Sequence, residues 1–355
     1  MRSANNQVHV PNPATILLMP IQQELIALTS PAQWRAALRE VPHAFGHTWE
    51  SCHALQQTTG QPVYLYQLHG DGARVVCPLV ERSHQGLVDI TTPPGFTGFT
   101  GTAPVADFAR HWQHFAQARG YVCGYIGLNP LLDPPDYFDP RQLHPAHRIY
   151  GLDLQRPVAE LFGQLSANRK VQLKTYPTAA ESMSWDKAIG TDFFLRHVRA
   201  FLEARRASAA SHYSPKALTY LLGLDNVLVA SYITGGEVQA VSVFGHTAFV
   251  ADYLFNVSVP AGQAHTALLL WHGIQRLRAL GLPVLNLGGG IRESDGVAEF
   301  KRRFGARQVL AACARQVYDP VRYEALCRQA GADPAVGAGG YFPPYRQPHL
   351  PLSLS

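Results

Sequence analysis

The stretch from residue 249 to residue 287 places the strongest constraint on what this chain can fold into. Apolar residues predict a strand over 249–257, and their helical spacing predicts a helix over 264–279 with one buried face. Gly281 follows as a helix-ending glycine, and 284–287 is typical of a buried strand. A strand–helix–strand order of this kind connects two parallel strands by a right-handed crossover. The sequence therefore predicts an α/β fold with a mixed, twisted sheet flanked by helices.

The same alternation of strands and helices occurs in both halves of the chain. In the first half, two strands are joined by the turn Gly70-Asp71-Gly72, a hairpin signal, and in the second half two strands flank Gly235-Gly236. A chain of 355 residues is also long enough for two domains. The predicted units are a flexible N-terminus over 1–19, a domain over 20–150, a second, catalytic domain over 151–329, and a Pro/Gly-rich tail over 330–355.

The remaining elements follow from local patterns. The expected helices lie at 33–39, at 105–119 and after Pro157, and the expected strands are 63–68, 73–79, 88–90, 121–128, 226–234 and 238–245. Prolines between residues 129 and 145 predict a long irregular connection. Thr191 or Asp192 is expected to cap the helix that carries Phe194 and Val198.

Composition limits the classes of function. Net charge is +5 with a pI near 9.0, which fits an anionic partner such as a phosphate-bearing donor or tRNA but fits background charge as well. The five cysteines contain no C-x-x-C, which argues against a disulfide framework or a zinc site and favours a reducing compartment. No secretory signal or 20-residue apolar run is visible, so we expect a cytoplasmic protein without a membrane span.

Three glycines, Gly288, Gly289 and Gly290, directly follow the predicted strand 284–287. Glycines let a backbone approach a ligand closely, and ligands of open α/β sheets bind at the ends of strands. A flexible turn would have the same composition. The pattern is therefore a candidate binding loop rather than proof of one.

A second candidate follows in the sequence Phe300-Lys301-Arg302-Arg303-Phe304. The two phenylalanines share a helix face, and a lysine or arginine beside them would neutralise a phosphate or a developing oxyanion. A solvated basic face is the alternative. Arg169, Lys170 and Lys174 form another basic patch on a predicted helix, where an anion site and a plain helix end are equally compatible with the pattern.

An aromatic, glycine-rich loop and a loop that carries Arg205-Arg206 and His212-Tyr213-Ser214 complete the candidates. The segments 91–99 and 205–214 are each suited to lining an acceptor groove, although either is also compatible with a plain loop. Histidine pairs such as His111 and His114 lack cysteine or carboxylate partners at zinc spacing, so no metal site is predicted.

Several of these pieces, taken in order, resemble the Fem-type (FemABX-like) aminoacyl transferases of the GNAT superfamily. The resemblance spans most of residues 60–325, and its pieces are 89–98, 193–214, 251–257, Leu287–Gly290, Asp295-Gly296 and Phe300–Gly305. It implies a tandem of GNAT-like domains and transfer of amino acids from aminoacyl-tRNA to peptidoglycan precursors. A bacterial branch of similar proteins comprises acetyltransferases linked to exopolysaccharide.

The resemblance also implies roles for individual residues. Lys301 is the expected catalytic residue, which stabilises charge as the acyl carbonyl is attacked, and Phe300 packs beside it. The expected donor or acceptor contacts are Gly288, Gly289, Gly290, Arg302, Tyr253, Asn256, Tyr213, Arg169, Lys170 and Lys174. Gln263 begins the turn that would hold the pyrophosphate of coenzyme A, with Thr266 where that motif has glycine.

Three hypotheses stay open. The first is an aminoacyl-tRNA-dependent transferase that acts on an amine or hydroxyl of a cell-envelope precursor or small metabolite. The second is an acyl-CoA-dependent N- or O-acetyltransferase. The third is a non-catalytic binding protein that has kept the fold. In the first two cases the donor is a co-substrate, and no permanently bound cofactor or metal is expected.

Overall fold

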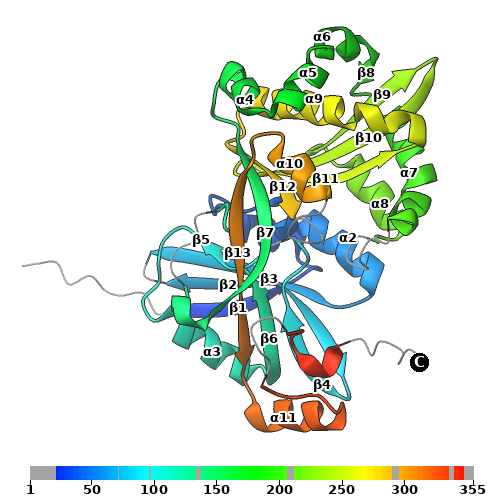
Figure 1. Ribbon diagram of the computed structural model, residues 1–355. Coiled ribbons are helices and arrows are strands. Elements are labelled where there is room, and N and C mark those ends of the chain that lie inside the picture. The colour runs from blue at the N-terminus through cyan, green and yellow to red at the C-terminus, as the bar shows by residue number, and fades with distance from the viewer. Residues whose placement is uncertain are drawn as a thin grey trace, which may run out of the picture.

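A computed structural model describes residues 21–70, 72–95, 97–132, 137–205, 212–289, 296–335 and 340–347. Residues 1–20, Gly290, Asp295 and 348–355 lie outside this part of the chain. Within it, one mixed sheet runs through the molecule, with helices packed on both of its faces (Figure 1). The predicted fold class is confirmed.

The N-terminal half is a sequence of strand, two helices, three strands, helix and strand. Its elements are β1 (Gln22–Ala27), α1 (Pro31–Leu38), α2 (Trp49–Thr59), β2 (Val63–Gly70), β3 (Ala73–His84), β4 (Leu87–Thr91), α3 (Phe108–Ala118) and β6 (Tyr121–Gly127), with a two-residue β5 (Thr100–Gly101) beside β3. The first four of these strands pair antiparallel in turn, and α3 then crosses over to place β6 parallel to β4.

The C-terminal half repeats this order. Its elements are β8 (Met183–Ser184), α7 (Lys187–Ala204), α8 (Pro215–Gly223), β9 (Val227–Thr234), β10 (Glu237–His246), β11 (Ala251–Ser258), α9 (Thr266–Ala279) and β12 (Val284–Gly289). Again four strands pair antiparallel, and a crossover helix places the last strand parallel to its neighbour, as the sequence predicted. The repeated order is that of two units in tandem.

Two long strands join the halves. β7 (Leu143–Asp153) pairs with β12, and β13 (Arg307–Val317) lies between β7 and β6. The complete order is β1-β2-β3-β4-β6-β13-β7-β12-β11-β10-β9-β8. β13 thus returns the chain to the N-terminal half, where α11 (Pro320–Gln329) packs against β6. Because one sheet runs through both halves, the domain limits at 150 and 329 remain a sequence prediction.

Short helices complete the fold. Those of the C-terminal half are α4 (Val158–Gln164), α5 (Ala167–Leu173), α6 (Tyr176–Ala179) and α10 (Gly296–Arg302), and the described 3₁₀ turns along the chain are η1 (Phe45–His47), η2 (Pro140–Gln142), η3 (Ala180–Ser182), η5 (Pro260–His265) and η6 (Pro344–Arg346). None of the described helices combines the length and apolar character that a bilayer crossing requires.

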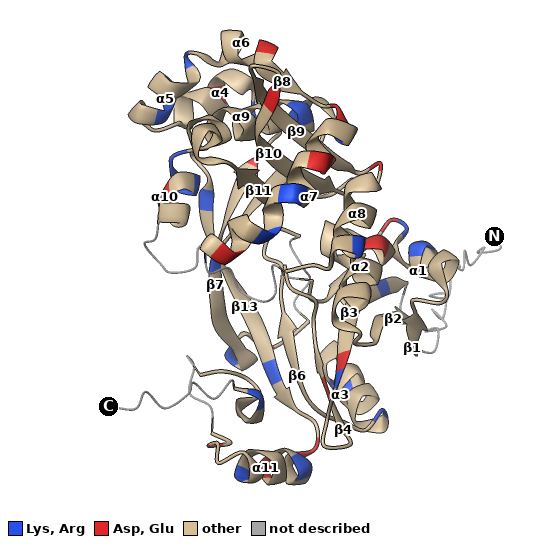
Figure 2. Ribbon diagram, turned by 90° about the vertical axis from the view of Figure 1, so that its right-hand side faces the viewer, with Lys and Arg blue, Asp and Glu red and all other residues tan. Residues whose placement is uncertain are grey.

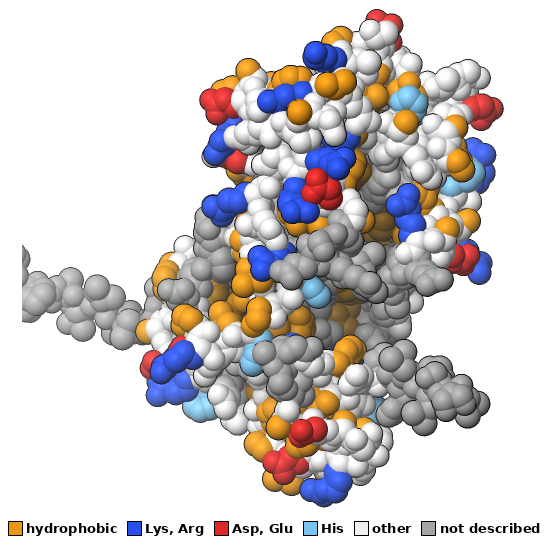
Figure 3. All heavy atoms as spheres, in the orientation of Figure 1, with side chains coloured by type: hydrophobic (Ala, Val, Ile, Leu, Met, Phe, Trp, Pro, Cys, Tyr) orange, Lys and Arg blue, Asp and Glu red, His pale blue; other side chains and the backbone are white. Residues whose placement is uncertain are grey.

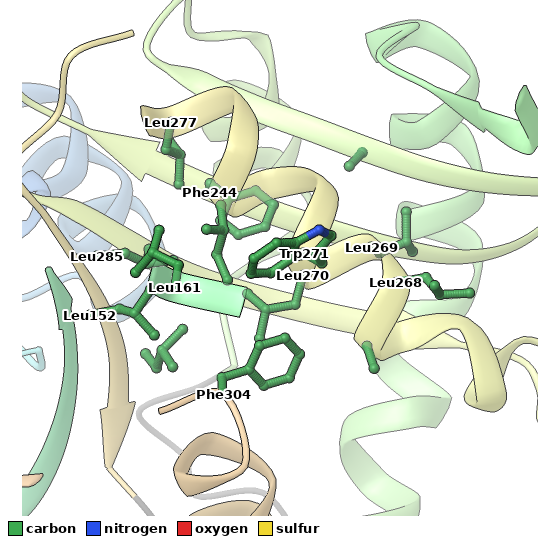
Figure 4. Packing of buried hydrophobic residues seen from close by; sticks show 14 of the residues in the cluster. Leu152, Leu161, Phe244, Leu268, Leu269, Leu270, Trp271, Leu277, Leu285 and Phe304 are labelled. Atoms are coloured by element: carbon green, nitrogen blue, oxygen red, sulfur yellow. The ribbon is translucent and has the colours of Figure 1, made fainter. Parts of the chain in front are cut away.

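The core of the C-terminal half forms where α9 lies on the sheet. Leu270, Ile274 and Leu277 are buried on the helix face that the sequence predicted, and Phe304 packs into the same cluster from beyond α10 (Figure 4). Gly273 allows the closest approach, because a Cβ there would lie 2.1 Å from the ring of Phe244 on β10. The glycine therefore sets the distance between helix and sheet.

We expect Gly273→Ala to destabilise the protein by about 1–3 kcal/mol through overpacking. The matched control is Gly163→Ala in α4, where an added Cβ meets nothing within 4 Å. There, alanine should stabilise by about 0.5–1 kcal/mol through helix propensity. Urea unfolding of both variants measures the difference, and equal stability of the two would contradict the packing argument.

Three local predictions are corrected. The helix α7 is capped by Asp186, whose side chain accepts hydrogen bonds from the amides of Ala188 and Ile189, so neither Thr191 nor Asp192 is the cap. The irregular connection ends earlier than predicted, because β7 begins at Leu143. β13 was not predicted as a strand, since its mixed pattern shows only intermediate burial over much of its length.

Candidate functional site

The parallel strands β11 and β12 pair over a short distance and then separate. They pair at Ala251–Leu285 and Asp252–Asn286, and β11 then continues to Ser258 without β12, paired with β10 on its other side. In the N-terminal half, by contrast, β4 and β6 stay paired from Val88 and Tyr121 to Thr91 and Tyr125, with one irregularity between Val88 and Ile90. The opening at the carboxyl end of β11 and β12 is where an open α/β sheet binds its ligands.

Asp252 and Asn286 close the inner end of this opening. Asn286 donates from Nδ2 to Oδ1 of Asp252 at 2.9 Å, and its own Oδ1 accepts the backbone N–H of Gly288 at 2.8 Å. Gly288 has a φ of +71°, a left-handed conformation that favours glycine, and it lies in an irregularity of the β12–β7 ladder. The first glycine of the predicted binding loop is thus held by a side chain inside the sheet.

The N-terminal half contributes to the same network. The backbone N–H of Phe45, in η1, donates to Oδ2 of Asp252 at 3.3 Å. His47 anchors η1: its Nδ1 accepts from the Ala44 amide at 3.3 Å and its Nε2 lies 3.0 Å from the Gly98 carbonyl. Groups from both halves of the chain therefore donate hydrogen bonds to the carboxylate of Asp252.

The environment of Asp252 changes its acidity. Burial raises the pKa of this carboxyl from 3.8 to about 6, although the hydrogen bonds from Asn286 and Phe45 lower it. A carboxylate with a pKa near 6 is mostly ionised at neutral pH, yet it is a stronger base than an ordinary aspartate. Such a value suits a group that accepts a proton during a reaction.

Lys301 lies directly behind the glycine loop. Its side chain is only 7% exposed, and Nζ donates to the carbonyl of Gly289 at 2.6 Å. A Cβ on Gly288 would lie 3.5 Å from the same nitrogen, so the absence of a side chain leaves the ammonium close to the backbone of the loop. The predicted catalytic lysine and the predicted glycine loop are thus together.

The opening continues into a cavity of about 330 Å³ between the halves. β11 forms its floor, α7 and α8 one wall, and the segments around Phe45 and Pro94 the other. Tyr213, Tyr253, Asn256 and Gly288, all predicted contacts, line it. Burial raises the pKa of each of the two tyrosines to about 12, which keeps both phenols protonated as hydrogen-bond donors at neutral pH.

Tyr253 and Asn256 share a partner. The Tyr253 hydroxyl lies 3.2 Å from Oγ of Ser242, and Asn256 donates from Nδ2 to the same oxygen at 3.2 Å. This serine on β10 fixes the rotamers of two lining side chains.

Arg169 lies outside the cavity but contacts the helix that carries Lys301. Its guanidinium carbon lies 4.9 Å and 4.6 Å from the ring centres of Phe300 and Phe304, and its Nη1 donates to Gln172. The side chain is 7% exposed, and its buried Nε has no hydrogen-bond partner. Burial, with the nearby charge of Arg303, lowers the pKa of Arg169 to about 10.

Lys301 is not itself among the described residues that line the cavity, and neither are the remaining predicted residues. Phe300 packs on the core, and Arg302 pairs with Glu299 at 2.7 Å. Lys170 is half-buried on α5, Lys174 is exposed at its end, and Gln263 is exposed on η5. Gly289 contributes through the carbonyl that Lys301 binds, and Gly290 lies outside the described residues.

Asp252, Asn286 and Phe45 were not predicted as site residues. The first two carried a usable signal, because each is a polar residue within an apolar run that was predicted to be a buried strand. Phe45 carried none, since its backbone amide, rather than its side chain, makes the contact. In the described part of the chain, no group of three His, Cys, Asp or Glu residues is arranged to hold a metal ion.

The comparisons with known proteins agree with this fold. Neither a protein-family model nor a curated protein sequence matches the chain. Among solved structures, FemX aligns with a TM-score of 0.64 at 9% identity, covering 86% of this chain and 99% of FemX.

Two further structures carry the fold. The C-terminal domain of a lysylphosphatidylglycerol synthetase from Agrobacterium fabrum, which the structure's description calls putative, aligns with a TM-score of 0.53 at 14% identity, covering 84% of this chain and 96% of that one. L-PGS from Bacillus licheniformis aligns at 0.52 and 14%, covering 85% and 98%. The resemblance to Fem-type proteins is thereby confirmed at the level of the fold.

Proposed function

We propose that this protein is an acyltransferase that moves an aminoacyl or acyl group from an activated donor to an amine or hydroxyl. The observation that carries the proposal is the carboxyl of Asp252, with a pKa of about 6, at the point where β11 and β12 part and beside a buried lysine. A base and a cation at one strand end are the two groups that acyl transfer requires. The fold shared with FemX supports the same reaction class.

The residues have separate roles in this reaction. Asp252 takes a proton from the acceptor, whose nitrogen or oxygen attacks the acyl carbonyl. Lys301 stabilises the negative charge that develops on the carbonyl oxygen, acting from beside the Gly288 backbone. The Asn286 hydrogen bonds hold both the carboxylate and the loop, so that base and cation keep a fixed separation.

We favour aminoacyl-tRNA as the donor. The segments 166–174 and 296–303 contain six cationic residues and one carboxylate, Glu299. Two of the six, Arg169 and Lys301, are buried, and the other four lie nearer the surface. The segments touch through the Ser166 amide and the Arg303 carbonyl at 3.0 Å. The ribbons of α5 and α10 carry basic positions (Figure 2), and basic side chains lie on the surface of this part of the molecule (Figure 3). A basic surface of this kind suits a phosphate backbone. An aminoacyl-tRNA donor would place the reaction in the cytoplasm.

The turn before α9 is less suited to acyl-CoA. It forms η5, in which the Gly262 amide donates to Val259 and the Thr266 amide to Gln263, so these N–H groups are already used within the turn. A Cβ on Gly262 would lie 1.9 Å from the Gln239 carbonyl oxygen, which shows how tightly the turn packs on β10. Acetyl-CoA remains the alternative donor, and the first experiment includes it.

The test follows radiolabel from mixed aminoacyl-tRNA, and separately from acetyl-CoA, into acceptors of a cell extract. We expect transfer from tRNA, and we expect Lys301→Met to reduce its rate about 100- to 1,000-fold, as loss of an oxyanion-stabilising donor does. Lys216→Met, at an exposed lysine on α8, is the matched control and should retain the full rate.

The other outcomes are equally clear. Transfer from acetyl-CoA alone would make the protein an acetyltransferase and overturn the choice of donor. Transfer from neither donor would favour a binding protein that has kept the fold. Transfer at an unchanged rate in Lys301→Met would show that Lys301 does not stabilise the developing charge.

A further inference from the structure

The cavity beside Asp252 has two chemically different ends. At one end lie Asp252, Asn286 and the backbone of Gly288. The wall formed by α7 and α8 is apolar: Val198 and Leu221 are almost fully buried, and Leu202 is half-buried above them. A ligand that fills this cavity therefore places a polar group at the strand ends and an apolar group against the two helices.

Charge restricts the polar group further. Among the described residues that line the cavity, Asp252 is the one that carries a formal charge at neutral pH. A carboxylate or phosphate placed against Asp252 would face a like charge, which is unfavourable in a partly buried site. The Lys301 ammonium lies behind the Gly288 backbone rather than in the described lining, and it donates to the Gly289 carbonyl. An ammonium group would pair with Asp252 and offset the desolvation of its carboxylate.

Size restricts the apolar group. The cavity volume of about 330 Å³ lies at the small end of ligand pockets, which suits a body the size of a leucyl or phenyl side chain. Phe45 and Tyr213 also line the cavity.

We propose that the acceptor is a primary amine with an apolar body, whose ammonium pairs with Asp252 while the body packs on Val198, Leu202 and Leu221. This inference rests on the proposed acyl transfer and names the substrate class of the same site. It distinguishes this site from one that takes an anionic, phosphate-linked acceptor into the cavity.

The proton balance follows from the pairing. Asp252 takes one proton from the ammonium, holds it while the amine reacts, and releases it to solvent when the products leave. The neutral nitrogen then attacks the acyl carbonyl and forms the C–N bond. As the bond from that carbon to the donor oxygen breaks, the second proton lost by the nitrogen ends on the leaving hydroxyl. The products are an amide and the free donor alcohol.

Matched probes test the acceptor class by calorimetric binding, without any donor. 2-Phenylethylamine and 3-phenylpropionate have similar apolar bodies and opposite charges, and ethanolamine keeps the ammonium without the apolar body. We expect the wild-type protein to bind 2-phenylethylamine at least tenfold more tightly than either of the other probes. Asp252→Asn should weaken amine binding at least tenfold, and Leu202→Gln should weaken it several-fold.

Each result decides the proposal. Equal or tighter binding of 3-phenylpropionate, equal binding of ethanolamine, or unchanged amine affinity in Asp252→Asn would overturn it. Thermal unfolding of both variants shows whether they are folded, and Leu202→Gln changes the apolar wall on α7 rather than the carboxylate on β11. If the amine binds as expected and no donor transfers label, the acyl-transfer proposal fails while the amine site stands. If label is transferred and the amine does not bind, the acceptor class alone fails.

Discussion

Replacing Asp252 by asparagine is expected to lower the rate of acyl transfer at pH 7 by about 100- to 10,000-fold, which is the usual contribution of a general base. The side chain is nearly isosteric, so the cavity keeps its shape while the proton acceptor is lost. Transfer of labelled aminoacyl groups under single-turnover conditions measures the effect. A loss of less than about threefold would show that Asp252 is not the base.

The pH dependence of the wild-type rate is a second test of the role of the Asp252 carboxyl. Because the carboxyl has a pKa of about 6 and acts when ionised, the rate should fall about tenfold per pH unit below 6 and level off above it. The variant should lose this limb. A wild-type rate that is constant from pH 5 to pH 7 would contradict the assignment.

The stability of Asp252→Asn should move in the opposite direction to its activity. The folded-state pKa of about 6 lies above the ordinary value of 3.8, so this group favours folding at low pH and loses that contribution as the pH rises through 6. At pH 7 the ionised carboxylate destabilises the folded protein. We therefore expect the variant to be at least as stable as the wild type at pH 7, which is common for residues kept for function.

The second large expected effect is the loss of folding stability at low pH that follows from protonation of His47. Burial lowers the pKa of this imidazole from 6.5 to about 4, with a smaller contribution from nearby His43. A base whose pKa is depressed on folding adds stability above pH 6.5 and loses it as the pH falls towards 4. At about 1.4 kcal/mol per pKa unit, its contribution should shrink by about 3 kcal/mol between pH 7 and pH 4.

Comparison with His47→Asn isolates this contribution, because the two proteins share every other titrating group, Asp252 included. At pH 7 the wild type should be the more stable protein, since asparagine cannot both accept from the Ala44 amide and reach the Gly98 carbonyl. Urea unfolding at several pH values should show the gap closing towards pH 4. A gap that is independent of pH would mean that His47 is not buried in its neutral form.

The fold could be predicted well from the sequence wherever local patterns and tertiary contacts agree. α9 and its flanking strands were predicted because their apolar periodicity coincides with their burial on one sheet. β13 was missed for the opposite reason: it is stabilised by strands from both halves, and no local pattern encodes partners so distant in the chain.

The candidate site was predicted only in part, where its residues are neighbours along the sequence. Lys301 and Gly288 are close in sequence, so one motif contained both residues that the structure brings together. Other residues were predicted because they are basic or belong to a turn motif, but they lie outside the described cavity lining. They are Arg302, Lys170, Lys174 and Gln263. Composition alone does not tell a cation in the site from one on the surface.

By itself, the sequence determined the alternation of strands and helices, the parallel crossover and the glycine–lysine motif, because these depend on hydrophobic periodicity and on neighbours along the chain. Only the tertiary structure decided that β11 and β12 part while β4 and β6 stay paired. It also decided that Phe45, Asp252 and Asn286 meet although up to 241 residues separate them along the chain. The acidity of Asp252 belongs to this second class, since desolvation depends on which atoms of both halves exclude water from the carboxylate.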